Sequence, residues 1–228
     1  HGVVSHIEST GIRTAAPDDV ENYIDYQAII VPAAAFMKKR SNCRIYQNLS
    51  VIDIVSDLFG QHGVAFQNKT MKSYPKYEYC VQYQEYDLDF VARLLQQEGI
   101  FYFFEHSSAA HTLVLADDIT AYKKCAEAKV RCFSGHLSKP HVSHWQGGLS
   151  MVSGACQQKG YDFEQPTLYP SGNKTTASLP KQASLEIFDY LGESEFNKRP
   201  QPYANTQLEA LQKETQNNTA FTLVLCLD

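Results

Sequence analysis

The sequence has no apolar run that approaches the roughly 18 residues a helix needs to cross a bilayer. It also lacks a basic excess, because 20 Lys and Arg stand against 25 Asp and Glu, for a formal net charge of −5. No basic stripe is available for the phosphates of a nucleic acid or for an anionic lipid surface. We therefore expect no membrane-spanning helix and no nucleic-acid partner.

Recognisable cysteine motifs are missing as well. The six cysteines are widely and irregularly spaced and form no CxxC pair: Cys43, Cys80, Cys125, Cys132, Cys156 and Cys226. A chain of this length can bury roughly 70 to 75% of its unfolded surface, so it needs no disulfide framework. The N-terminus also shows no charged-then-apolar secretory signal. We expect free thiols and assembly in the cytoplasm.

The stretch from Tyr79 to Asp117 predicts one strand–helix–hairpin unit. Period-two alternation over 79–84 predicts a strand with one face on the core. Asp87 then offers an N-cap carboxylate, and Gly99 ends the helix because glycine readily takes the left-handed conformation. Between them an apolar stripe recurs at helical spacing and should face the core: Leu88, Phe90, Val91, Leu94 and Leu95.

The second half of this unit predicts a β-hairpin. The aromatic run Ile100–Phe104 is too short for a typical helix and predicts a strand buried on both faces. Segment 111–116 should be its partner, after a small-residue turn at 107–110.

A second amphipathic helix is predicted to begin at Ser50, with Asp53 completing a capping box. Its apolar stripe is Val51, Ile54, Val55, Leu58 and Phe59, and Gly60 and Gly63 should end it. The flanking segments predict strands at 1–8, 26–31 and 221–227, a polar loop at 14–22, short strands after residue 130, and a third helix over 203–215.

Three collinear segments, CRIYQNLSVIDIV (43–55), YCVQYQEYDLDFVARLLQQEGIFYFFEH (79–106) and HTLVLAD (111–117), resemble the hub region of the VgrG family of type VI secretion tip proteins. That region is similar to the baseplate hub of contractile phage tails. The later segments GYDFEQP and LEIFDYLG support the resemblance.

The resemblance implies an α+β, predominantly β fold that is phage tail hub-like, with barrel-like β lobes and a small α/β lobe. On this basis we expect residues 1–31 in part of a first β-barrel lobe, 32–125 in the α/β lobe and 126–228 in a second β-barrel lobe. The chain begins without a start signal, and we expect further segments before it and a spike after it.

The function implied by the resemblance is structural. The chain would belong to a homotrimer that caps the hexameric Hcp tube, carries the puncturing spike and effectors, and contacts baseplate proteins. It would touch a target membrane only through the spike, and would be secreted after firing. The alternatives are a contractile phage tail baseplate hub and a tail-associated cell-wall hydrolase.

The sequence offers only weak signals for a metal site or a catalytic nucleophile. His136, His141 and His144 cluster, but their spacing is not that of a zinc-binding helix and Pro140 prevents one. Cys156 looks like the most loop-like thiol and could be a nucleophile, yet GxSxG, GxGxxG and P-loop patterns are missing.

Four carboxylates at the ends of the central helix could be imagined as a glycosidase acid/base pair: Glu85, Asp87, Asp89 and Glu98. Helix capping and the helix dipole explain the first three more simply, and Glu98 should be an exposed last-turn residue. The aromatic stripe at 101–104 is read as core, because no Lys or Arg interleaves it. We predict no catalytic, cofactor-binding or metal-binding residues.

Overall fold

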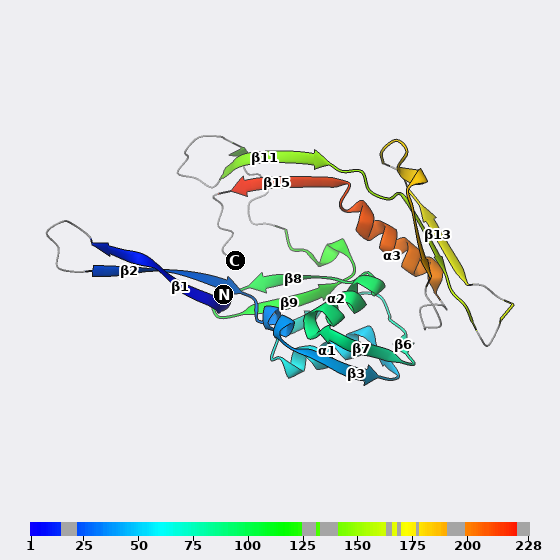
Figure 1. Ribbon diagram of the computed structural model, residues 1–228, viewed down its shortest axis with the longest axis horizontal. Helices are drawn as coiled ribbons and strands as arrows, with labels where there is room; N and C mark the ends of the chain where they lie inside the picture. The colour runs from blue at the N-terminus through cyan, green and yellow to red at the C-terminus, as the bar shows by residue number, and fades with distance from the viewer. Residues whose placement is uncertain are drawn as a thin grey trace.

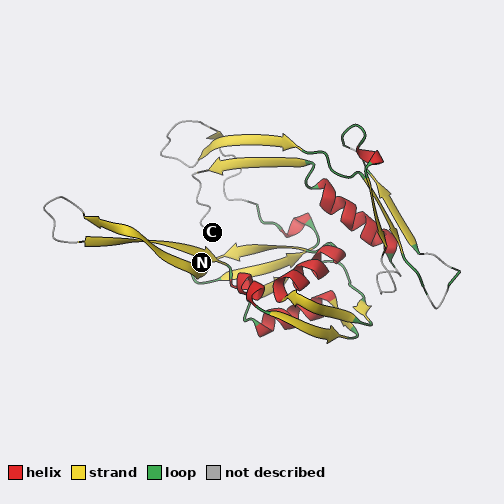
Figure 2. Cartoon of the chain, in the orientation of Figure 1, coloured by secondary structure: helices red, strands yellow, loops and turns green. Residues whose placement is uncertain are grey.

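The computed structural model describes residues 1–14, 22–124, 131–132, 141–162, 166–167, 170–176, 178–190 and 199–222. Figure 1 shows a two-stranded ribbon that projects away from a helix-bearing central lobe, and a second ribbon, β11 with β15, that lies apart from that lobe. Helix α3 connects the second ribbon to a small sheet containing β13 (Figures 1 and 2). No helix among the described residues is long and apolar enough to span a membrane.

The central lobe combines three helical segments with short strands. The helical segments are η1 (Ala33–Lys39), α1 (Val51–Gln61) and α2 (Asp87–Glu98). The strands are β3 (Ser41–Tyr46), β4 (Leu49–Ser50), β5 (Phe66–Asn68), β6 (Lys76–Tyr77), β7 (Cys80–Tyr86), β8 (Phe101–His106) and β9 (His111–Ala116), followed by the 3₁₀ turn η2 (Ile119–Ala121). Strand β3 pairs with β7 and β4 with β6, while β9 lies between β5 and β8.

Helix α1 follows its sequence pattern closely. Ser50 and Asp53 form the predicted capping box, and the whole predicted stripe is buried. The helix runs through Gly60 to Gln61, and Gly63, at φ +62°, takes the left-handed conformation just beyond it. The stripe packs into one core with α2 and with Leu113 and Leu115 of β9.

Helix α2 ends as predicted at Gly99, which is left-handed at φ +71°. Its start differs from the prediction. Tyr86 occupies the N-cap without a side-chain hydrogen bond, and Asp87 is the first helical residue, fully buried. The predicted cap carboxylate therefore points into the lobe, where it meets cationic side chains in place of backbone N–H groups.

The strands that flank α2 are confirmed, and β7 has one face on the core as predicted, but β8 does not have both faces buried. In β7 the buried side chains are Cys80 and Gln82, whereas Tyr83 is 68% exposed. Strand β8 is not buried on both faces, because Tyr102 is 41% exposed. Its pairing with β9 in the predicted hairpin is confirmed. Aromatic content alone did not indicate which face meets the core.

The N-terminal ribbon pairs β1 (Val3–Thr14) with β2 (Asn22–Val31) in antiparallel register, with irregularities between Val4 and His6 and between Ser9 and Gly11. The predicted strands at 1–8 and 26–31 are confirmed and are longer than expected. The predicted loop lies mostly outside the described residues, at 15–21. Nearly all the described side chains of this ribbon are exposed.

The described residues of the C-terminal region form two three-stranded sheets. One orders β10 (Arg131–Cys132), β11 (His141–Leu149) and β15 (Gln216–Thr222), and the other orders β13 (Ser171–Thr175), β12 (Ala155–Lys159) and β14 (Glu186–Tyr190), with the 3₁₀ turn η3 (Gln182–Ser184) before β14. Strand β15 begins before the predicted closing strand, whose residues from 223 onward lie outside the described chain.

Helix α3 (Pro200–Gln212) confirms the predicted third helix and packs on β12 and β13. Gly172 permits this contact, since a Cβ there would lie 2.4 Å from the Pro200 backbone.

Sheets of two or three strands account for every strand in the described part of the chain, and none of them closes into a barrel. The mostly β composition with few helices agrees with the predicted fold class, whereas the barrel-like lobes and the boundaries at 31 and 125 stay predictions.

Candidate functional site

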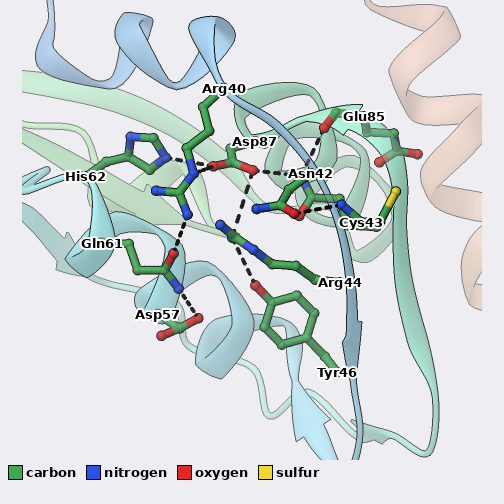
Figure 3. A network of polar contacts seen from close by, with 11 residues as sticks. Arg40, Asn42, Cys43, Arg44, Tyr46, Asp57, Gln61, His62, Glu85 and Asp87 are labelled. Atoms are coloured by element: carbon green, nitrogen blue, oxygen red, sulfur yellow. Dashed lines mark hydrogen bonds and ion pairs between the residues drawn. The ribbon is translucent and has the colours of Figure 1, made fainter.

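The most developed polar cluster surrounds the Asp87 carboxylate. His62 Nε2 lies 2.7 Å from Asp87 Oδ2, and Gln82 Nε2 donates to Oδ1 at 2.7 Å. The guanidinium groups of Arg40 and Arg44 approach the two oxygens at 3.4 Å and 3.8 Å. Figure 3 shows the cationic side chains converging on this single buried carboxylate. The cluster joins β3, β7, α1, α2 and the end of η1.

Two opposing effects act on the pKa of Asp87. Burial raises the pKa, while hydrogen bonds from Gln82 and His62 and the charges of Arg44 and Arg40 lower it and prevail. The net result is a pKa held below the ordinary aspartate value. The lowered pKa disfavours Asp87 as a general acid, and its burial among Gln82, His62, Arg40 and Arg44 makes it the polar centre that joins these elements.

The other members of the imagined acid/base set are also engaged or exposed. Glu85 pairs with Arg93 Nη2 at 3.0 Å, and Asp89 is solvent-exposed in the first turn of α2. The prediction that Glu98 is exposed is wrong, because its side chain is only 6% exposed. The described carboxylates are therefore distributed among separate structural contacts and do not face one another across a cleft.

Glu98 forms a joint between the central lobe and α3. Its Oε1 accepts from Tyr77 at 2.8 Å, from Arg199 at 2.9 Å and from Tyr203 at 3.1 Å. Burial, together with the Glu98 charge, raises the pKa of both tyrosines well above the ordinary range. Both hydroxyls thus remain protonated donors, and the joint persists across the physiological pH range.

The histidine and cysteine candidates are separated. His141 is buried at the start of β11, His144 is exposed further along the same strand, and His136 lies outside the described residues. Among the described residues no group of three potential ligands is placed to hold a metal ion.

The prediction that Cys156 lies in a loop is wrong, because it is buried within β12. Burial first, and then the charges of Asp189 and Glu186, raise the pKa of its thiol. Its Sγ donates to Gln207 Oε1 at 2.9 Å. A protonated, buried and hydrogen-bonded thiol is a poor nucleophile.

Two further observations concern the remaining cysteines and aromatics. Cys43, Cys80 and Cys132 are free thiols, while Cys125 and Cys226 lie outside the described residues. In β8, Phe101 stacks on Tyr122 with ring centroids 5.3 Å apart, and neither residue belongs to the core cluster against which Phe104 packs. The stripe at 101–104 is therefore only partly in the core.

Both ribbons expose several large apolar side chains. On β1 and β2 these side chains are 41 to 64% exposed: Val3, Val4, Ile7, Ile24, Tyr26, Ile29 and Ile30. On β11 the exposed side chains include Trp145 at 60% and Leu149 at 70%. Val4 and Ile30 pair across the two strands, and neighbouring exposed apolar side chains of this kind mark sites of protein–protein contact.

Sequence reasoning missed the partners of Asp87 that come from other elements. Arg40, Arg44 and His62 lie on different elements, so no local spacing connects them with Asp87. One signal was present: Arg44 interrupts a strand whose partner residue, Gln82, is also polar, and opposed polar residues on paired strands indicate a buried polar contact. The Glu98 joint bridges more than a hundred residues and left no such signal.

Comparisons with known proteins place nearly all of the chain in one family. A family model described as "Phage tail baseplate hub (GPD)" matches residues 1–223. The type VI secretion system spike protein VgrG1c of Pseudomonas aeruginosa is 31% identical over 219 residues, which are 94% of this chain and 29% of that protein. VgrG4b of the same organism is 36% identical over 173 residues, 73% of this chain and 21% of that protein. The chain thus spans less than a third of the length of these relatives.

Solved structures share the fold. A component of the type VI secretion system from E. coli, the c3393 protein, superposes with a TM-score of 0.51 at 20% identity, covering 98% of this chain and 56% of that one. A 43 kDa tail protein of prophage MuSo2 from Shewanella oneidensis gives a TM-score of 0.54 at 12% identity, covering 92% and 60%. The resemblance read from the sequence is confirmed, and the chain belongs to the phage tail baseplate hub family.

Proposed function

We propose that this chain is the hub segment of a type VI secretion spike protein, with a structural and non-enzymatic role. The family match over residues 1–223 carries the proposal, and the similarity to proteins named type VI spike proteins favours this setting. In this role three copies form a ring that caps the hexameric Hcp tube and carries a spike and effectors. The complex assembles in the cytoplasm and is secreted on firing.

The ribbons support self-association. A two-stranded ribbon is marginally stable in water unless it packs on further structure. Strands β1 and β2 each have a free outer edge among the described residues, and in the β10–β11–β15 sheet the edge strand β15 lies beside β11, which exposes Trp145 and Leu149. We propose that these edges meet copies of the same chain, so that segments 1–31 and 126–228 complete barrel-like lobes only in the assembled ring.

Light scattering over a dilution series tests the proposal. The full-length protein should be a trimer, whereas this segment should associate in a concentration-dependent way, because a spike that fastens three chains raises the effective concentration of every other contact. Co-sedimentation with preformed Hcp tubes should retain the trimer at one end of each tube. A full-length protein that stays monomeric and turns over cell-wall material would replace the hub by the hydrolase.

A contractile phage tail baseplate hub remains the second candidate. The observation that favours it is the superposition on prophage tail proteins, with a TM-score of 0.54 for the Shewanella protein. Co-sedimentation distinguishes the two candidates. Binding to a phage tail tube and not to Hcp would assign the chain to a phage particle.

A further inference from the structure

The base of the N-terminal ribbon, where its two strands reach the central lobe, is contacted by one histidine. Val3 pairs with Val31, so residues 1–2 and 32–33 continue from the same end of the ladder. Figure 1 shows this end of the ribbon beside β8 and β9. His111, the first residue of β9, makes a hydrogen-bond contact with each of the two segments. One side chain of the lobe thus holds both strands of the ribbon.

The first of these contacts is with the backbone of Ala33, whose N–H group donates to Nε2 of His111 at 2.9 Å. Ala33 is the first residue of η1, and the first N–H groups of a helix have no carbonyl partner within it. Pro32, which precedes it, makes no side-chain capping hydrogen bond. His111 therefore supplies the acceptor that this N–H group needs.

The Ala33 contact determines the protonation state of His111. A backbone amide only donates, so we assign the lone pair to Nε2 and the ring proton to Nδ1. Nδ1 lies 3.2 Å from Nδ1 of His1, and this assignment makes it the donor of that pair. Only the neutral ring can make both contacts, because a charged imidazole has two N–H donors and no acceptor.

The other described ring contacts of His111 offer no counter-charge. Phe104 and His106 of β8 lie with their ring centroids 6.2 Å from that of His111, and His106 is its partner in the β-ladder. The ring of His1 lies at 5.4 Å. Three histidine rings therefore meet at the base of the ribbon, and acidification brings like charges together there.

The charged residues on the neighbouring elements are directed elsewhere. Glu105 of β8 projects from the opposite face of its strand to His106, and it is held by Lys69 at 2.9 Å and by Lys123 at 3.0 Å. The basic residues of η1 lie in its last turn, at the far end from Ala33: Lys38 and Lys39. No carboxylate in the described part of the chain thus forms an ion pair that would stabilise a charged His111.

We propose that His111 is a pH-dependent latch, which holds the ribbon against the lobe while its ring is neutral and frees the orientation of the ribbon when the ring takes up a proton. A proton on Nε2 would point an N–H group at the N–H group of Ala33, so the hydrogen bond is lost and two donors face each other. Histidine is the side chain that ordinarily changes charge between pH 8 and pH 5. The latch goes beyond the hub function, because it acts within the single chain.

Nuclear magnetic resonance on the ¹⁵N-labelled chain tests the assigned tautomer. Long-range correlations between ring protons and ring nitrogens distinguish the two neutral forms of histidine. At pH 8 His111 should carry its proton on Nδ1, because Nε2 accepts from Ala33.

Hydrogen exchange of the Ala33 amide measures the latch itself. Its protection, relative to an unstructured chain at the same pH, should fall about fivefold or more between pH 8 and pH 5, as for the loss of one hydrogen bond. The Val64 amide, which donates to the Phe59 carbonyl at 2.9 Å within the lobe, should remain protected and show that the lobe stays folded. Residual dipolar couplings of the β1 and β2 amides should fit the orientation of the lobe at pH 8 and depart from it at pH 5.

Two variants separate the latch from the other histidines. His111→Gln places an amide oxygen near the position of Nε2 and does not titrate, so Ala33 protection should be the same at both pH values. His106→Gln removes the neighbouring ring and leaves the Ala33 hydrogen bond in place. It should therefore preserve the loss of Ala33 protection on acidification.

Three results would overturn the latch. These are a proton on Nε2 of His111 at pH 8, Ala33 protection that is unchanged at pH 5, and the same pH dependence in His111→Gln as in the unsubstituted chain. Loss of Ala33 protection at pH 5 with ribbon couplings that still fit the lobe would show that other contacts hold the ribbon, and would overturn its release.

Discussion

The central lobe and the ribbons differ in what their apolar side chains contact. In the lobe, Phe90 and Leu94 are 0% exposed and lie in one continuous core. On the N-terminal ribbon, Ile7 is 61% and Ile30 is 64% exposed. Burial of a large apolar side chain is worth about 1.5 to 3 kcal/mol, so the lobe gains stability from internal contacts that the ribbon lacks. The lobe holds its large apolar side chains in a core of its own, whereas the N-terminal ribbon leaves them exposed to solvent.

The largest expected effect on stability comes from a substitution in the core of the lobe. Leu94→Ala should lower the free energy of unfolding by roughly 2 to 5 kcal/mol, because it loses transfer free energy and leaves a cavity. Chemical denaturation followed by circular dichroism measures the change.

The control belongs on the exposed face of the same helix. Sequence periodicity places Gln97 there, but its Oε1 is buried. Gln96, which is exposed, is the better control, and Gln96→Ala should change the free energy of unfolding by less than about 0.5 kcal/mol. Equal midpoints for the Leu94 and Gln96 variants would contradict the packing described for α2.

The second effect concerns the buried charge in the lobe. Asp87→Asn leaves Arg40, Arg44 and His62 facing a neutral amide and should cost about 2 to 3 kcal/mol. This is below the usual cost of breaking a buried pair, because Arg40 is 41% exposed and can be resolvated. Asp89→Asn, at an exposed position in the same turn, is the matched control.

The pH dependence gives this effect a distinct signature. Since folding lowers the pKa of Asp87, its contribution is fully present above the unfolded pKa of about 3.9 and is lost as pH falls through the folded pKa. The stability difference between the protein and Asp87→Asn should therefore be constant near neutrality and shrink below about pH 4. A difference that grows on acidification would refute the anchoring role.

The third effect should separate assembly from stability. Ile30→Lys on the exposed ribbon should change the free energy of unfolding by less than about 0.5 kcal/mol, yet weaken self-association about tenfold or more. Gln27→Lys on the same strand makes the same charge change without removing an apolar side chain. If Ile30→Lys destabilises the monomer as much as Leu94→Ala does, the ribbon is packed like the lobe and the contrast between them is lost.

The smallest effect concerns the thiols. Cys43 is exposed, whereas burial raises the pKa of Cys80 to about 11. Iodoacetamide at pH 8 should modify Cys43 well before Cys80, and Cys43→Ser should change stability by less than about 0.5 kcal/mol. Thiol titration of the denatured chain without reductant should find all six cysteines free, while recovery of disulfides would contradict the predicted thiols.

Local patterns predicted the elements, and tertiary contacts decided their faces. The stripe of α1, the cap at Ser50 and the stop at Gly99 depend on neighbours within one or two helical turns, so the sequence contains the information that places them. In β7 the exposed face is aromatic and the buried face holds Gln82, because the Asp87 carboxylate requires a donor there. Periodicity finds such a strand but cannot show which face meets a charge from a distant element.

For the candidate site too, local motifs were readable from the sequence, whereas contacts between distant segments were not. Family resemblance indicated a hub from motifs at 43–55 and 79–117, and the comparisons confirmed the family. Cys156 was misplaced because its flanking Ser, Gly and Ala resemble a turn, yet hydrogen bonding to β13 and β14 on either side makes this segment a central strand. Such pairing partners are remote in sequence and leave no mark on local composition.

The pairing of β11 with β15 also determines when each part of the chain can fold. Val142 pairs with Thr222, and β12, β13, β14 and α3 all lie between these strands in the sequence. Pairings between distant residues form slowly, because a long loop must close before any contact compensates for the lost entropy. During synthesis the central lobe can complete its core while β15 has yet to emerge. Strand β11 must wait with an open edge for its last partner, and Gly147 and Gly148 within it reduce its tendency to pair with the wrong one.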